Sequence, residues 1–96
     1  MSEETKTHHA YMVLTPKYGW HCTTAAKLKR YKSSGRIISP VRFWPDYHLA
    51  KDWSRKTGRD VILKIEIPGI SYPMPDHKPA YWSPDDVTKF EVLKTY

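Results

Sequence analysis

The side chains best suited to catalysis or ligand binding belong to three consecutive residues, His21, Cys22 and Thr23. An imidazole gains and loses a proton near neutral pH, and a thiol beside it suggests a nucleophile with its base. Adjacent side chains of a strand point to opposite faces, however, so His21 and Cys22 cannot form such a pair. We therefore predict that Cys22 is a small buried hydrophobe. His21 is then either a ligand-binding residue or a hydrogen-bonded histidine of the interior or of a cleft.

The other histidines do not form a metal-binding pattern. His8 and His9 are adjacent near the N-terminus, and His48 and His77 stand alone, so no repeated ligand spacing occurs. We predict no metal site, and we place His48 and His77 on the surface.

The elements that position His21 follow from capping residues and periodicity. Residues 20–23 indicate a brief strand, which leads into a helix over 25–33 with Thr24 as its N-cap and Gly35 after its end. An extended stretch over 41–44 precedes a second helix, which Pro45 and Asp46 open and which runs to about residue 56, before Gly58. The alternating apolar residues of 60–67 predict the clearest strand, with one end buried on both faces.

The C-terminal third is irregular first and extended afterwards. Residues 68–79 contain four prolines and predict an ordered loop that is a stiff turn, a lid over a cleft or a docking surface. Residues 80–82 and 89–93 predict two last strands, with a turn or one helical turn over 83–86 between them. The fold class is α+β, a small mixed and split sheet with two helices, over a single domain of residues 10–96. Residues 1–9 are polar without periodicity and are expected to be a disordered tail.

Aromatic side chains dominate the apolar composition. They make up 14% of the chain, and the helices offer few aliphatic residues, so we expect most of the larger rings to form the core. One or two of them are expected to line a cleft instead. The rings in question are Trp20, Phe43, Trp44, Trp53, Tyr81 and Trp82.

The positive charge is concentrated in the middle of the chain. Between Thr24 and Lys64 there are eleven Lys and Arg against three Asp, while the remainder holds five Lys against seven acids. A basic region suggests a polyanionic partner such as nucleic acid or a phosphorylated cofactor, although the same charges could simply solvate two helices. A single Cys, no long apolar stretch and no signal-like N-terminus predict a cytoplasmic protein that does not enter the membrane.

The order of these elements and a few short motifs carry a resemblance to a known family. From Trp20 to Leu93 the chain resembles the small ADP-ribosyltransferase-like proteins, a group that includes RNA 2′-phosphotransferases and several toxin domains. The shared pieces are an aromatic–His–x–Thr strand (WHCT) entering a helix that ends in Gly, a helix with an inward Ala50, the strand over 61–67, and a Pro-containing turn before the last strand. The segments WHCTTAAKLKRY, PVRFWPDYHLAKDW and YPMPDHKPAYW also resemble segments of small bacterial and phage proteins with no assigned activity.

The resemblance implies a role for several residues. His21 would bind the ribose next to nicotinamide, and Thr23 would support the same ribose or the nicotinamide amide. Arg42 would contact a phosphate. A ring from Phe43, Trp44 or Tyr47 would stack on nicotinamide. His21 and Arg42 are thus the candidate catalytic residues, and NAD is the implied cofactor.

One departure from the family leaves catalysis open. The transferases usually carry a Glu before the Pro-containing turn, and Ala80 stands near that position. If the chain is active, the resemblance implies NAD-dependent ADP-ribosyl transfer or 2′-phospho transfer. Two other functions also remain open: a basic nucleic-acid-binding module, and a non-catalytic protein-interaction domain of the phage type. The oligomeric state is open as well.

Overall fold

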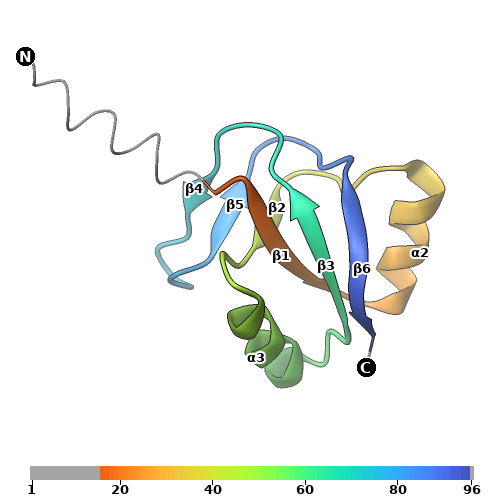
Figure 1. Cartoon of the computed structure of the whole chain (residues 1–96), viewed down its shortest axis with the longest axis horizontal. Helices are drawn as coiled ribbons and strands as arrows, with labels where there is room; N and C mark the ends of the chain where they lie inside the picture. Colours follow the sequence, from red (N-terminus) through yellow and green to blue (C-terminus); the bar gives the residue numbers. More distant parts are fainter. Residues whose placement is uncertain (1–15, 96) are drawn as a thin grey trace, which may run out of the picture.

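The computed structural model describes residues 16–95, which form two helices and six strands (Figure 1). In chain order the elements are β1 (Tyr18–Thr23), α2 (Ala25–Ser34), β2 (Val41–Phe43), α3 (Tyr47–Thr57), β3 (Val61–Glu66), β4 (Tyr72–Pro73), β5 (Tyr81–Ser83) and β6 (Phe90–Thr95). The expected tail over 1–9 and the apolar residues 10–14 lie outside the described residues.

Both helices begin and end where their capping residues predict. The Thr24 hydroxyl and the Asp46 carboxylate each accept a backbone N–H of the first helical turn, at 3.2 and 3.0 Å. Gly35 and Gly58 follow the two helices with φ of 79° and 70°. This left-handed conformation strains most residues but not glycine, so it ends each helix without cost in strain.

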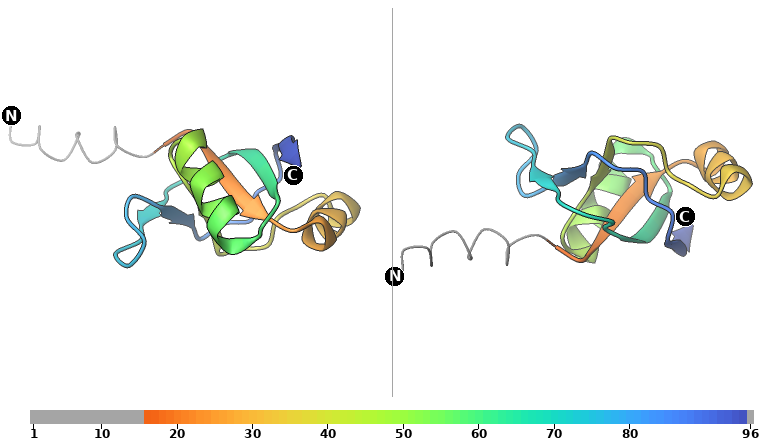
Figure 2. Two further views of the ribbon diagram at one scale, coloured as in Figure 1. Left: turned by 90° about the horizontal axis from the view of Figure 1, so that it is seen from below. Right: turned by 90° about the horizontal axis from the view of Figure 1, so that it is seen from above.

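The strands form two small antiparallel sheets. The first sheet has the order β1-β3-β6, and the second has the order β2-β5-β4. α3 packs across β1 and β3 on one face of the first sheet (Figure 2). β4 and β5 lie at the opposite end of the molecule from β6 and α2 in all three views of Figures 1 and 2. The predicted α+β class with two helices and a split sheet is therefore confirmed.

The core lies between the two sheets and is mainly aliphatic. On β3, Val61, Leu63 and Ile65 alternate toward the core, while Ile62 is equally buried on the face that α3 covers. Two-sided burial at the start of β3 confirms the prediction for this strand. Of the six rings expected in the core, only Phe43 is fully buried, and the other five are partly exposed.

Gly19 lets β1 approach the second sheet closely. A Cβ at this position would lie 2.2 Å from Cδ2 of Phe43, inside any allowed contact distance. The ring of Phe43 is held from its other side by Tyr81, with centroids 5.7 Å apart and planes 12° apart. The absence of a side chain at Gly19 is therefore what allows this ring to fill the space between the sheets.

The loop after β3 is more regular than predicted. Residues 68–79 include the two-residue strand β4, which pairs with β5. Within residues 16–95, no helix is long and apolar enough to cross a membrane.

Candidate functional site

A cavity of about 290 Å³ opens where the two sheets meet. Trp20 and Trp44 exchange two backbone hydrogen bonds, of 2.9 and 2.8 Å, and so join β1 to the residue after β2. In a continued antiparallel ladder, Cys22 would next bond to Arg42. The carbonyl of Arg42 instead accepts a hydrogen bond from the His21 side chain, so the strands part after one bridge and leave the cavity between them.

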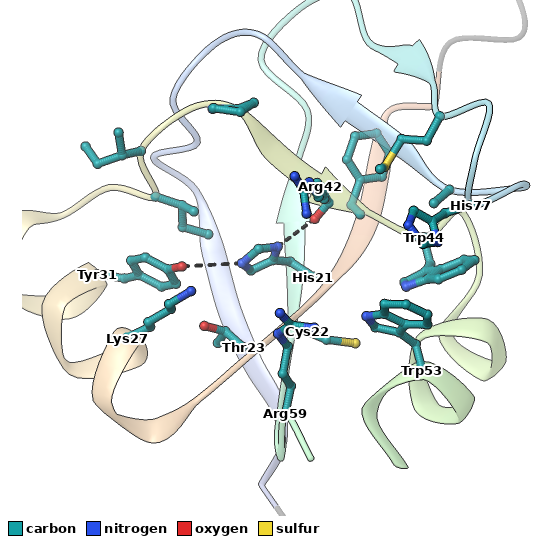
Figure 3. A pocket seen from close by; sticks show the side chains of 16 residues that line it. His21, Cys22, Thr23, Lys27, Tyr31, Arg42, Trp44, Trp53, Arg59 and His77 are labelled. Carbon is teal, nitrogen blue, oxygen red and sulfur yellow. Dashed lines mark hydrogen bonds between the residues drawn. The ribbon is translucent and has the colours of Figure 1, made fainter. Parts of the chain in front are cut away.

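His21 lies at the centre of the cavity wall (Figure 3). Its Nδ1 lies 2.6 Å from the Arg42 carbonyl oxygen, and its Nε2 lies 3.5 Å from the hydroxyl of Tyr31. A carbonyl oxygen only accepts, so Nδ1 carries the proton, and Nε2 of the neutral ring accepts a long hydrogen bond from the Tyr31 hydroxyl. The side chain is therefore oriented to offer a hydrogen-bond acceptor.

The surroundings of His21 keep it neutral. Burial lowers the pKa of His21, and the nearby positive charges of Lys27 and Arg59 lower it further. The hydrogen bond to the Arg42 carbonyl acts in the opposite direction but does not outweigh burial. At neutral pH Nε2 is thus an acceptor, and a hydroxyl or amide donor of a ligand can replace its long bond to the Tyr31 hydroxyl.

The cavity is lined by positive charges and by no carboxylate. Lys27 from the start of α2, Arg42 from β2 and Arg59 from the α3–β3 turn all line it. No Asp or Glu is among its lining residues. Because the three cations converge from separate elements, the cavity favours an anionic ligand.

Thr23 adds a buried hydroxyl to the same wall. The residue is 1% exposed, and its Oγ1 has no hydrogen-bond partner within the described part of the chain. Figure 3 shows this hydroxyl on the side of Lys27. A buried polar atom without a partner destabilises the fold, so pairing with a ligand or a water would favour binding here.

The opposite end of the cavity is aromatic. The rings of Trp44 and Trp53 lie 5.7 Å apart, and the ring of His77 meets Trp53 edge-on at 5.4 Å (Figure 3). His77 belongs to the Pro-rich loop, which backbone bonds between Met74 and Ala80 and between Ala80 and His77 close at 2.8 and 2.7 Å. This end offers ring faces and edges to a planar, uncharged group.

The structure brings together five of the six predicted site residues. The residues that line the cavity are His21, Thr23, Arg42, Phe43 and Trp44. Tyr47, at the first turn of α3, is not among them, and its ring contacts the imidazole of His48 at 5.7 Å. Phe43 belongs to the core, so Trp44 is the predicted aromatic residue whose ring remains partly exposed at the cavity.

Polar or aromatic side chains that were not predicted as site residues also line the cavity: Lys27, Tyr31, Trp53, Arg59 and His77. The charges of the helices leave two interpretations open, a polyanionic partner and simple solvation, because a lysine on a short helix gives no signal of its direction. Lys27 lies in the first turn of the helix that directly follows His21 and Thr23, and this position was the one indication in the sequence that it could reach their site. Nothing local to residues 53, 59 or 77 indicates the cavity.

Cys22 is separate from this chemistry. Its thiol lies 3.1 Å from the Ala50 carbonyl oxygen and donates to it, toward α3. Burial raises the pKa of Cys22 to about 11, so the thiolate is scarce at neutral pH. His21 and Cys22 thus bond to different elements and form no catalytic pair.

Ala80 lines the cavity and is 4% exposed. This residue stands near the position where the transferases that the chain resembles usually carry Glu, and the cavity has no carboxylate there. Among residues 16–95, no group of three or more His, Cys, Asp or Glu is placed to hold a metal ion.

No protein-family model, no curated protein and no solved structure matches this chain. The resemblance to ADP-ribosyltransferase-like proteins stays a prediction that rests on the motifs given above.

Proposed function

We propose that this domain binds the phosphorylated ribose of a nucleotide, as found in NAD or at the end of a nucleic acid, and that it does so without ADP-ribosyl transfer. One observation carries the proposal: Lys27, Arg42 and Arg59 converge on a cavity that no carboxylate lines and in which His21 offers a neutral acceptor. Phosphate suits the cations, and a ribose hydroxyl suits Nε2 of His21.

The aromatic end of the cavity supports a nucleotide over a simple anion. Trp44 and Trp53 offer apolar ring area within the cavity that also holds the cations. A base or a nicotinamide ring stacks on such side chains, whereas inorganic phosphate gains nothing from them. Small-molecule sites commonly combine an apolar wall with a few convergent polar groups in this way.

Titration of the protein with nicotinamide mononucleotide, followed by calorimetry or ligand-observed NMR, tests the proposal. Arg59→Ala removes a lining cation, and Arg55→Ala removes an exposed arginine of the same region that does not line the cavity. We expect Arg59→Ala to weaken binding by about 10- to 150-fold, which corresponds to one charge-assisted hydrogen bond, and Arg55→Ala to leave it near the wild-type value. Equal losses in both variants, or no saturable binding, would refute the proposal.

Two controls separate the other functions. RNA or DNA without a terminal phosphate serves as the first control. If it binds with a steep salt dependence and Arg59→Ala does not weaken that binding, the general nucleic-acid-binding module is favoured instead. Labelled NAD consumed in the presence of the protein would contradict the absence of transfer.

A further inference from the structure

The outer face of the second sheet carries a row of three side chains, which we call the outer row: Arg42, Trp82 and Tyr72. In the antiparallel register Arg42 lies opposite Trp82, and Trp82 lies opposite Tyr72. Residues directly opposite each other share one face of a sheet. Phe43 and Val41 of β2 are buried in the core, so the outer row is on the other face.

Trp82 is a half-buried ring with a covered side and an open side. The Tyr72 ring lies 5.1 Å from it at 36° on one side of the row. Trp82 also lines a second cavity of about 320 Å³, together with Pro40, Arg42, Met74, Pro75 and Asp76. The indole of Trp82 therefore packs against Tyr72 and also borders the second cavity.

The two cavities adjoin each other. Pro40, Arg42 and Met74 line both of them, so these residues form the ridge between the two spaces. Arg42 is exposed and is the only cation of this ridge. A ligand whose central group binds to the Arg42 guanidinium can therefore place one end in the first cavity and its other end in the second.

The charges of the two cavities differ in a way that suits such a ligand. The first cavity holds Lys27 and Arg59 besides Arg42, whereas the second holds Asp76 besides Arg42. A phosphate is attracted to Arg42 and repelled by Asp76, so it is held at the ridge. Beyond it, the carboxylate of Asp76 accepts hydrogen bonds from hydroxyl or amino groups, and Trp82 suits a planar ring.

We infer that the second cavity binds the second nucleoside of a ligand in which two nucleosides are joined through phosphate, with that phosphate on Arg42 and the second base on Trp82. This inference rests on the proposed function of the first cavity. The size of the first cavity agrees with it, because about 290 Å³ is just below the range of about 300–1,000 Å³ for small-molecule sites and leaves little room for a second nucleoside. Two sources share the chemistry: NAD, with a pyrophosphate link, and a short RNA, with a phosphodiester link.

The test compares ligands of one and two nucleosides on the full chain. Dissociation constants are measured for nicotinamide mononucleotide, AMP, NAD and a 5′-phosphorylated diadenylate, with wild-type protein and with Trp82→Ala. We expect Trp82→Ala to weaken a two-nucleoside ligand by about 5- to 150-fold, as measured for one base–aromatic stack, and to leave the two mononucleotides unchanged. A loss for NAD identifies a pyrophosphate link between the two nucleosides, and a loss for the diadenylate identifies a phosphodiester link.

Two variants guard against a loss of folding. Asp76→Asn alters an exposed residue outside the core, so it should not change the unfolding midpoint. It removes the charged acceptor for the second nucleoside, whereas its loss of repulsion acts on the phosphate of every ligand, so it should weaken the two-nucleoside ligands relative to the mononucleotides. Tyr18→Ala removes an exposed ring that lines neither cavity and should change no affinity.

The outcomes separate this inference from the proposed function. If mononucleotides bind and both NAD and diadenylate bind no more tightly, with no effect of Trp82→Ala or Asp76→Asn, the second subsite is refuted and the first stands. If mononucleotides fail to bind as well, the proposed function itself is wrong.

Discussion

Replacement of His21 by Asn separates the two bonds that this imidazole can make. The amide nitrogen of Asn lies near the position of Nδ1 and can still donate to the Arg42 carbonyl, which Nδ1 approaches to 2.6 Å in the wild type. The acceptor at Nε2 and the titrating proton are both lost. His21→Asn should therefore retain the tie between β1 and β2 while it removes the group offered to a ligand.

The effect on stability depends on pH with a definite sign. Burial lowers the pKa of His21 in the folded protein below its ordinary value of 6.5, so the unfolded chain takes up a proton at a higher pH than the folded chain does. The wild-type protein therefore has its full stability from this group above pH 6.5 and loses it as pH falls through the folded-state pKa. Between those two pKa values the loss approaches about 1.4 kcal/mol per pH unit.

Urea unfolding of wild type and His21→Asn at pH 7.5, 6.5 and 5.5 measures this difference. The two proteins differ at position 21 alone, so the comparison isolates this group. We expect the free energy of unfolding of the wild type to fall more steeply on acidification than that of the variant. A difference that is constant over this range, or a wild type that gains relative stability in acid, would show that the fold does not hold His21 neutral.

Ligand affinity supplies an independent measure of the same group. At pH 7.5 His21→Asn should weaken nucleotide binding by about 2- to 12-fold, the contribution of one neutral hydrogen bond. His21→Ala removes the tie to Arg42 as well and should lower the free energy of unfolding by about 1 kcal/mol. Equal stability of the Ala and Asn variants would mean that the bond to Arg42 does not hold the strands.

Three further predictions concern packing and charge. Gly19→Ala should lower the free energy of unfolding by about 1–3 kcal/mol in urea melts, because its Cβ would overlap the buried ring of Phe43 at 2.2 Å. The Asp86 carboxylate accepts a hydrogen bond from the N–H of Ser39 at 2.8 Å, and that bond lowers the pKa of Asp86 below its ordinary value of 3.8. In urea melts the wild type should therefore be more stable than Asp86→Ala above pH 3.8, and this difference should disappear as the pH falls through the folded-state pKa. Because burial raises the pKa of Cys22 to about 11, iodoacetamide should alkylate it far more slowly in the native protein than in urea at pH 8, and equal rates would contradict the burial of the thiol.

The local elements were predictable because their signals are local. Thr24 and Asp46 cap the two helices, and Gly35 and Gly58 end them, as the sequence indicates. β3 was evident from its apolar alternation, since it is the strand at the centre of the core. Short edge strands such as β4 give no such pattern, and their existence depends on a partner.

The site was predictable only near the strand–helix junction. His21 and Thr23 share a strand face, so their proximity follows from alternation. That Arg42 joins them depends on where β1 and β2 separate, which only the tertiary structure determines. Arg59 and Lys27 approach the cavity from two different turns, and no spacing in the sequence relates them.

The charges of the cavity oppose any reaction that breaks the nicotinamide–ribose bond of NAD. Loss of nicotinamide develops positive charge on the ribose, and the transferases that the chain resembles usually place a carboxylate near the position where Ala80 lines this cavity. A cation about 6 Å away repels such a charge by about 3 kcal/mol at an effective dielectric constant of about 20, and three cations line the site. The same cations favour a phosphoryl group, whose charge stays negative throughout its transfer. If this domain catalyses any reaction, we therefore expect it to act on a phosphate without NAD as the acceptor, and NAD to bind to it intact.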